Sequence, residues 1–200
     1  MKKFLLAFYT LSFISFCAFS QQKDIKERYS EIRYFGSKEG SIEKRVTLMV
    51  KILNDSSQLT LKQITWMQFY IGKYYEGINK PDSAIFFFEK SLKGEPDYEV
   101  AHRALGFIYM DKTKPYVDQI NLANKNKDAV ANAKAYAEYK KLILKALPHL
   151  EKYQACSPDD ETLMIISNLY KSLKDTQSML TIDARLKVLG KRCITLLEDE

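Results

Sequence analysis

The sequence predicts an all-α fold in which antiparallel helical hairpins stack side by side. Three observations indicate it. Apolar residues recur at steps of three and four along most of the chain, which is the spacing of one helix face. Gly and Pro are few, at seven and five in 200 residues, as is typical of helical chains. The stretch from 65 to 111 also repeats itself at a fixed offset, which indicates copies of one supersecondary unit.

The offset of this internal repeat is 34 residues. Matching residues stand that far apart: Ile71-Gly72 and Leu105-Gly106, and Tyr75 and Tyr109. A second set lies between the two copies: Ala84, Phe88 and Pro96. In this order the residues resemble the tetratricopeptide (TPR) repeat, a helix-turn-helix unit marked by an aromatic residue, Leu-Gly, Tyr, Ala, Phe and Pro. Three positions depart from that pattern: Gln68 in the aromatic slot, Ile71 for Leu, and Ser91 for a small Ala.

The resemblance covers about 60–190, and it extends to exported bacterial TPR proteins through an insertion followed by the segment 146–152. It implies an α-solenoid of about three units, preceded by an N-terminal helical hairpin. It also implies a surface that docks other molecules rather than a catalyst.

The first twenty residues have the pattern of a secretory signal peptide. Two lysines precede an apolar run from Phe4 to Phe19, and a small-x-small cleavage site follows at 18–20. An uncleaved membrane anchor is the alternative, but the 16-residue run is shorter than the roughly 20 residues that span a bilayer. A lipid anchor on Cys17 is disfavoured by the large Phe16 before it. We therefore expect export to the periplasm or cell envelope, with no transmembrane segment in the mature chain.

The N-terminal hairpin is expected over 21–59, because two stretches there have apolar residues at helical spacing. The first stretch carries Ile25, Tyr29 and Ile32, and the second carries Ile42, Val46, Met49 and Leu53. Neither has the Gly and Tyr markers of the repeat. A divergent unit is expected at the end of a stack.

The first repeat is expected over about 65–98. Its first helix begins after the capping box Thr60-x-x-Gln63 and ends near Gly77. Pro81 stands in the first turn of the second helix, where its missing N–H is harmless. Gly72 costs roughly 1 kcal/mol against Ala inside a helix, which indicates that a partner helix crosses there.

The second repeat is expected over 99–159, with an insertion of 28 residues. Its partner-helix markers Ala146, Leu150 and Pro158 stand 62 residues after their counterparts, which is 28 more than the repeat offset. We expect a loop over 112–127 and a helix from 128 that continues into the partner helix as one long rod. Pro148 predicts a kink in this rod, or alternatively a break.

The third unit is expected over 160–190, with a last helix from Asp175 to Gly190, and 191–200 is expected to be a tail. Cys156 and Cys193 remain after signal removal. Export makes a disulfide between them chemically possible, but pairing requires their Cα atoms to lie within about 7 Å. The alternative of two free thiols stays open.

Charge and motifs argue against nucleic-acid binding and catalysis. The formal net charge is +6, and basic residues alternate with acidic ones, as on solvated helix faces. His102 and His149, the only histidines, have no Cys, Asp or Glu at metal-ligand spacing. No nucleophile motif or glycine-rich phosphate loop is present. We therefore expect no enzyme activity, cofactor, metal or nucleic-acid partner.

In a TPR stack the first helix of each unit lines the concave face, so residues off its buried stripe face a groove. Six of these mix apolar anchors with cations: Trp66, Phe69, Lys73, Arg103, Phe107 and Met110. Aromatic and Arg side chains dominate binding energy at interfaces, so we expect an exported TPR adaptor or scaffold that binds a protein or peptide in this groove. The TPR carboxylate clamp is absent, because Phe69 and Phe107 stand where Lys and Asn are usual.

Two alternatives remain. In the first, the N-terminal hairpin or the inserted rod folds over the concave face, and these aromatic residues belong to the core. In the second, the chain is a structural subunit of a cell-envelope complex and docks through its outer face or its inserted helix. The pattern assigns no oligomeric state.

Overall fold

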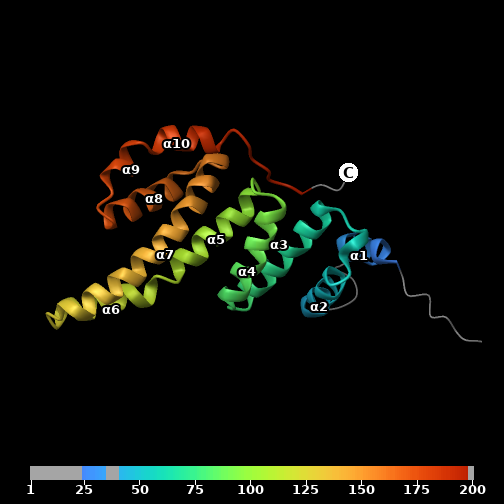
Figure 1. Ribbon diagram of the computed structural model, residues 1–200, viewed down its shortest axis with the longest axis horizontal. Coiled ribbons are helices and arrows are strands. Elements are labelled where there is room, and N and C mark those ends of the chain that lie inside the picture. The colour runs from blue at the N-terminus through green and yellow to red at the C-terminus, as the bar shows by residue number, and fades with distance from the viewer. Residues whose placement is uncertain (1–23, 35–40, 198–200) are drawn as a thin grey trace, which may run out of the picture.

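The structure is a computed structural model that describes residues 24–34 and 41–197, so the predicted signal peptide lies outside the described residues. The described chain is helical almost throughout (Figure 1). Its elements are α1 (Ile25–Tyr34), α2 (Ile42–Leu53), a short 3-10 turn (Ser56–Gln58), α3 (Leu61–Gly77), α4 (Pro81–Gly94), α5 (Glu99–Asp111), α6 (Lys114–Lys125), α7 (Ala129–Cys156), α8 (Asp160–Ser172), α9 (Thr176–Leu180) and α10 (Ile182–Leu189).

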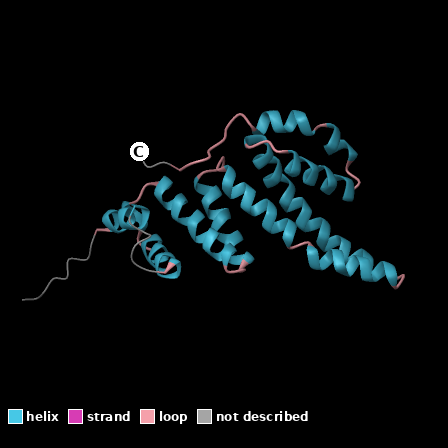
Figure 2. Ribbon diagram, turned by 180° about the vertical axis from the view of Figure 1, so that it is seen from behind, coloured by secondary structure: helices cyan, strands magenta, loops and turns pink. Residues whose placement is uncertain are grey.

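The helices follow one another along a stack, as the views from the front and from behind agree (Figures 1 and 2). α3 packs against α4, α5 against α7, and α7 in turn against α8 and α10. α6 lies against the first half of α7, and this pair projects from the stack as a hairpin. The prediction of an all-α stack of antiparallel helical hairpins is confirmed. None of the helices in the described part of the chain combines the length and apolar character that crossing a bilayer requires.

Local sequence signals account for the start of the first repeat. Thr60 Oγ1 accepts from the Gln63 backbone N–H at 3.2 Å, and Gln63 Oε1 accepts from the Thr60 N–H at 3.0 Å. The predicted capping box is therefore formed. α4 begins at Pro81, as expected. Ala84 and its counterpart Ala146 are both fully buried, in agreement with the 62-residue offset.

The inserted segment differs from the sequence prediction in its first half. Residues 112–127 are not a loop but contain α6. Pro115 lies in the first turn of α6, where it removes no helical hydrogen bond. Ala123 is buried and Ile120 half-buried, which is the spacing of a helix face that packs on a neighbour. α7 continues from Ala129 to Cys156 through Pro148 as one helix, so the alternative of a break is wrong.

The last predicted helix is divided in two. α9 ends at Leu180, and α10 begins at Ile182. Arg185 Nη1 donates to the Ser178 carbonyl at 2.8 Å and to Thr181 Oγ1 at 2.6 Å. The guanidinium thus donates to a carbonyl at the point where the helix is interrupted.

Residues 191–197, which we name the C-terminal strap, are not a free tail. The strap crosses from α10 toward α1 (Figure 1). The Ile194 N–H donates to the Asp97 carbonyl at 2.9 Å, and the Glu99 N–H donates to the Ile194 carbonyl at 3.0 Å. Arg33 Nη2 donates to the Leu197 carbonyl at 2.9 Å, and the Leu197 side chain is buried. The strap therefore satisfies backbone groups at the start of α5 and supplies a residue to the core.

Two apolar clusters hold the stack together. The N-terminal core joins α1, α2, α3 and the strap, and its members include Tyr29, Met49, Trp66, Met67, Ile71 and Leu197. The main core joins α4, α5, α7 and α8, and its members include Phe88, Leu105, Ile143, Leu150 and Ile166. Phe69 packs against both clusters and so links them.

Candidate binding groove

The N-terminal part of the predicted groove is filled by the chain itself. Trp66 is only 5% exposed. The Tyr29 ring of α1 meets it edge-on at 5.8 Å between centroids, and the Arg33 guanidinium lies 4.5 Å from the indole centroid. α1 must bury an apolar stripe, and it does so over α3. The prediction that Trp66 contacts a ligand is therefore wrong, and the alternative of a covering N-terminal hairpin holds here.

Two other predicted groove residues also lie away from an open surface or are already paired. Phe69 is half-buried, with its ring 4.9 Å from that of Tyr98 and 5.6 Å from that of Phe88. Lys73 is exposed but forms an ion pair with Glu76 on the same helix. Neither residue lines the hollow that contains Arg103.

The C-terminal part of the concave face is open. A hollow of about 570 Å³ lies between α5, the end of α7 and the start of α8. We name it the concave groove, and its lining is Arg103, Phe107, Tyr153, Ser157, Pro158, Asp159, Glu161 and Thr162. It contains two of the six residues predicted from the sequence. Tyr153 and Glu161 were not predicted, because one lies on the partner helix and the other in a capping segment.

Arg103 has the chemistry of a recognition residue. Its guanidinium lies 5.2 Å from the Phe107 ring centroid and 5.6 Å from that of Tyr153. Stacking on aromatic rings orients the planar fork of an Arg while leaving its N–H donors free. Among the described residues Arg103 forms no ion pair at 4.0 Å or less.

One of the two acids that line the groove is already engaged. The Asp159 carboxylate accepts the Thr162 backbone N–H at 2.7 Å and caps α8. This hydrogen bond is the main reason that the pKa of Asp159 is lowered, and the charge of Arg103 is a smaller one. Glu161 stands beside it and is exposed. The groove therefore offers a cation on α5 and carboxylates on α8.

A second hollow, a cleft of about 830 Å³, opens where α4, α5, α6 and α7 meet. Phe107 lines this cleft as well as the concave groove. Tyr116, Lys141 and Lys145 form part of its wall, and all three come from the inserted hairpin. Met110 is half-buried and lines neither hollow. Because the hairpin is inserted between the repeat markers, the repeat pattern could not indicate this wall.

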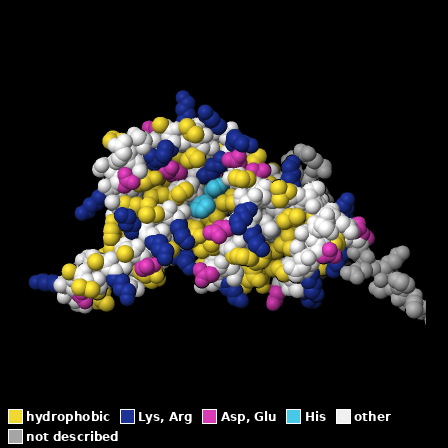
Figure 3. Space-filling view, in the orientation of Figure 1, with side chains coloured by type: hydrophobic (Ala, Val, Ile, Leu, Met, Phe, Trp, Pro, Cys, Tyr) yellow, Lys and Arg dark blue, Asp and Glu magenta, His cyan; other side chains and the backbone are white. Residues whose placement is uncertain are grey.

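The two histidines form a pair that sequence spacing did not reveal. His102 Nδ1 lies 2.9 Å from His149 Nδ1, and His102 Nε2 lies 2.9 Å from the Pro96 carbonyl. The carbonyl only accepts, so His102 carries its proton on Nε2, and the His149 Nδ1–H donates to His102 Nδ1. Both rings are then neutral. Figure 3 shows the pair at the surface beside hydrophobic side chains.

Burial is the main cause of the low basicity of this pair. It lowers the pKa of His149 to about 4, with the neighbouring His102 as a further cause. Burial likewise lowers the pKa of His102, against the hydrogen bond to Pro96. The described residues contain no group of three or more His, Cys, Asp or Glu side chains placed to hold a metal.

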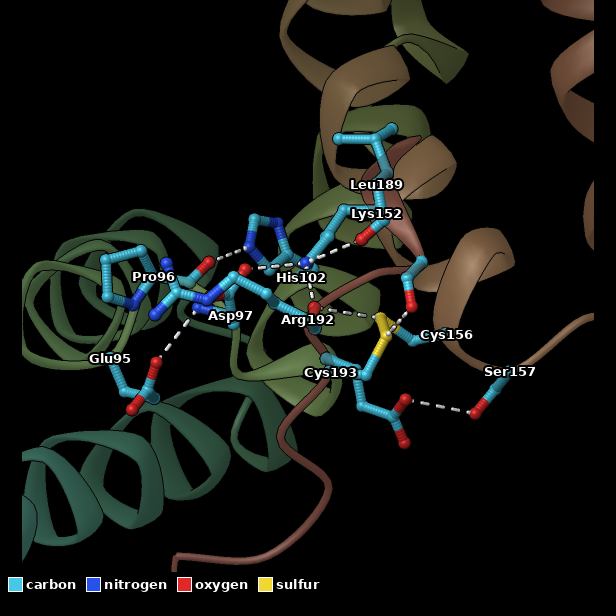
Figure 4. The surroundings of a disulfide bond; sticks show 12 residues. Glu95, Pro96, Asp97, His102, Lys152, Cys156, Ser157, Leu189, Arg192 and Cys193 are labelled. Atoms are coloured by element: carbon cyan, nitrogen blue, oxygen red, sulfur yellow. Dashed lines mark hydrogen bonds and ion pairs between the residues drawn. A yellow bond between two sulfur atoms is a disulfide. The ribbon is translucent and has the colours of Figure 1, made fainter. Parts of the chain in front are cut away.

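A buried lysine and a disulfide fasten the strap near this pair (Figure 4). Lys152 Nζ donates to Asp97 Oδ1 at 2.6 Å, to the Leu189 carbonyl at 3.0 Å and to the Arg192 carbonyl. One turn further along α7, Cys156 is bonded to Cys193, with Cα atoms 5.5 Å apart. The disulfide that the sequence left open is therefore formed.

No protein-family model, curated protein or solved structure matches this chain.

Proposed function

We propose that the chain is an exported adaptor of the TPR type that binds a protein or peptide in the concave groove. The observation that carries the proposal is Arg103, stacked on Phe107 and Tyr153 with no carboxylate ion pair in the described chain. A guanidinium fork held in an open groove is suited to a planar carboxylate.

The groove supports a specific mode of docking. A carboxylate of the partner pairs with Arg103, and an apolar side chain packs on Phe107. Glu161 and the capped Asp159 stand on the facing helix, where they complement an amine or a basic side chain of the partner. Oppositely charged walls fix the direction in which an extended segment lies, since the reverse orientation places like charges together.

This proposal keeps the function expected from the sequence but changes the residues that perform it. Arg103 and Phe107 remain as contacts, and Tyr153 and Glu161 join them. Four residues expected from the sequence are no longer assigned to the groove: Trp66, Phe69, Lys73 and Met110. The proposal assigns no catalytic step, cofactor or metal, and the partner is a polypeptide.

A test begins with peptides selected for binding from a displayed random library. Each is measured by isothermal titration against the parent chain and the Arg103→Gln variant. We expect the variant to bind at least about tenfold more weakly, since a charged hydrogen bond contributes roughly 1.5–3 kcal/mol. Lys187→Gln on α10 is the matched control, because Lys187 is exposed and lies outside the groove.

Two results of this titration would contradict the proposed groove. Equal loss in both variants would indicate a general charge effect, and unchanged binding in Arg103→Gln would place the ligand elsewhere. Either result would overturn the groove. Thermal melts of both variants should coincide with that of the parent chain, because neither side chain is in the core.

A structural role in an envelope complex is the second candidate, and the projecting α6–α7 hairpin favours it (Figures 1 and 2). Such a subunit would retain its assembly when Arg103 is substituted, and would lose it when the hairpin surface is changed.

A further inference from the structure

Positive charge is concentrated on the inserted hairpin, which we define as residues 112–145. This segment contains eight Lys and three acidic residues, a formal net charge of +5. The rest of the chain between 24 and 197 contains twenty Lys or Arg and nineteen Asp or Glu, a net charge of +1. The lysines alternate with other residues along the sequence, and the helical hairpin brings them together.

Five of these eight lysines form no ion pair with a carboxylate of the described chain. Three of the eight form ion pairs: Lys112 with Asp82, Lys114 with Asp111, and Lys141 with Glu138. Lys145 lies over the Tyr109 ring. The other four are exposed and form no ion pair in the described part of the chain: Lys125, Lys127, Lys134 and Lys140. Three of them lie within the last two turns of the hairpin tip.

The tip holds a defined shape. Lys127 has a φ of 54°, in the left-handed region that closes a helix end. The Asp128 N–H donates to the Ala123 carbonyl at 2.9 Å, and the Asp128 carboxylate caps α7 by accepting from the Val130 and Ala131 N–H groups. The lysines of the tip are therefore carried on a fixed turn.

Large aliphatic side chains stand among these lysines without cover. Val130 is 81% exposed and Leu122 is 59% exposed. Each lies about one turn from the tip, on a different helix, beside Lys134 and Lys125. Figure 3 shows basic and hydrophobic side chains together along the projecting hairpin. Lysines beside exposed apolar side chains are also the two components with which surface-bound helices attach to anionic membranes.

The narrow tip of the hairpin, as distinct from its sides and base, is better suited to a membrane than to a protein. A stable protein interface buries about 800 Å² on each partner, which a projecting two-helix tip does not readily offer. The large cleft lies at the base of the hairpin, not at its tip. Lipid headgroups rearrange around a narrow insertion, so a bilayer needs no complementary hollow.

We propose that the tip of the inserted hairpin binds the surface of an anionic bilayer. Leu122 and Val130 enter the boundary between headgroups and acyl chains, and Lys125, Lys127 and Lys134 pair with acidic headgroups. Binding is peripheral and reversible, and it weakens as salt screens the lysines. This property goes beyond the proposed adaptor role and uses none of the residues of the concave groove.

Co-sedimentation with vesicles tests the proposal. We expect the full chain to bind vesicles in which phosphatidylglycerol replaces about a third of the phosphatidylcholine, and not to bind pure phosphatidylcholine. The triple variant Lys125→Glu, Lys127→Glu, Lys134→Glu should lose at least about tenfold in affinity. Its matched control is Lys93→Glu, Lys174→Glu, Lys187→Glu, which changes the net charge equally at exposed sites off the hairpin and should stay within about twofold of the parent chain.

Entry of the hairpin tip into the membrane can be measured separately by tryptophan fluorescence. The only Trp in the chain is buried, so Val130→Trp adds an exposed indole to a constant background. Its emission should shift to shorter wavelength on acidic vesicles. Leu180→Trp on α9 is the control, because Leu180 is 82% exposed and lies off the hairpin; its emission should not shift.

Three results would overturn the membrane assignment. The control triple variant loses as much binding as the hairpin variant, or the Val130→Trp emission stays unchanged on acidic vesicles. The third is that the chain binds heparin, an oligonucleotide or an acidic protein through the hairpin lysines but does not bind acidic vesicles. Arg103→Gln should bind vesicles like the parent chain, so failure of the adaptor proposal and failure of this one are distinguished.

Discussion

Leu150 of α7 packs so closely on Gly106 of α5 that a Cβ on the glycine would lie 2.7 Å from Leu150 Cδ2. The same contact occurs one unit earlier, where a Cβ on Gly72 would lie 2.8 Å from the Phe88 ring. The glycines are 34 residues apart and their partners 62. The internal repeat is thus a repeated packing contact, and the insertion leaves that contact intact.

Gly106→Ala should destabilise the fold by about 1–3 kcal/mol, the usual cost of overpacking a core. Leu150 has little freedom to retreat, because its backbone N would lie 3.2 Å from the new Cβ. Urea unfolding followed by circular dichroism measures the change. Gly77→Ala is the control, since its Cβ would meet nothing within 4 Å. It should stabilise α3 by about 0.5–1 kcal/mol. Equal changes in stability for the two variants would show that the close contact with Leu150 is not the reason that position 106 requires glycine.

Removal of the disulfide should lower stability by about 2–4 kcal/mol, because the bond closes a long loop in the unfolded chain. Its cysteines are separated by 37 residues. We expect the double variant Cys156→Ala, Cys193→Ala to melt lower than the parent chain by differential scanning fluorimetry. A thiol reductant should lower the parent to the same temperature and leave the variant unchanged. A melting temperature of the parent that is insensitive to reductant would contradict the bond.

Lys152 should be among the most sensitive polar positions. Its ammonium is nearly buried and bonds Asp97 together with two carbonyls, so Lys152→Met leaves the Asp97 carboxylate with only the exposed Arg192, whose Nε lies 3.4 Å from Asp97 Oδ2, as an ion-pair partner. We expect a loss of about 3 kcal/mol, as for other broken buried pairs.

The matching variant Asp97→Asn and the double variant complete a thermodynamic cycle for this pair. The double variant should lose less than the two single losses added together, because the lysine and the carboxylate compensate each other. Additive losses in urea unfolding would show that Lys152 acts only through the carbonyls.

The histidine pair predicts a decrease in stability at acidic pH. His149 has a pKa of about 4 in the folded chain, against 6.5 for an unperturbed His. Between these values the unfolded state binds the proton and the folded state does not, so the free energy of unfolding falls as pH falls from 6.5 to 4. The slope from His149 is at most about 1.4 kcal/mol per pH unit.

His149→Gln isolates this contribution, because the substitution removes the imidazole and leaves every carboxylate of the chain in place. Chemical unfolding at a series of pH values should give the variant a shallower decline across the same window. Above pH 6.5 the two curves should run parallel. Parallel curves below 6.5 as well would exclude the pair as the cause.

Much of the fold could be predicted from local sequence patterns. The predictions that were wrong concerned features that depend on contacts between residues far apart in sequence. The capping box at Thr60 and the length of the insertion were readable, because each depends on residues close in sequence or on a fixed offset. The repeat pattern assigned both Trp66 and Arg103 to the groove. Only the docking of α1 on α3 makes one of them core and leaves the other in an open groove.

The remaining differences have the same origin. The strap has no helical period, and its order comes from pairing with Asp97 and Arg33, far away in sequence. The disulfide depended on a distance that spacing does not contain. For α6, the Asn-rich composition and Pro115 favoured a loop. The steps of three and four from Tyr116 through Ile120 to Ala123 were the signal for a helix.

The path of the strap has a consequence for biosynthesis. Leu197 belongs to the same core as Tyr29 and Trp66, so this core is completed only by a segment that is synthesised more than a hundred residues after α1 and α3. Until then, part of the apolar surface of α1 and α3 lacks its native cover.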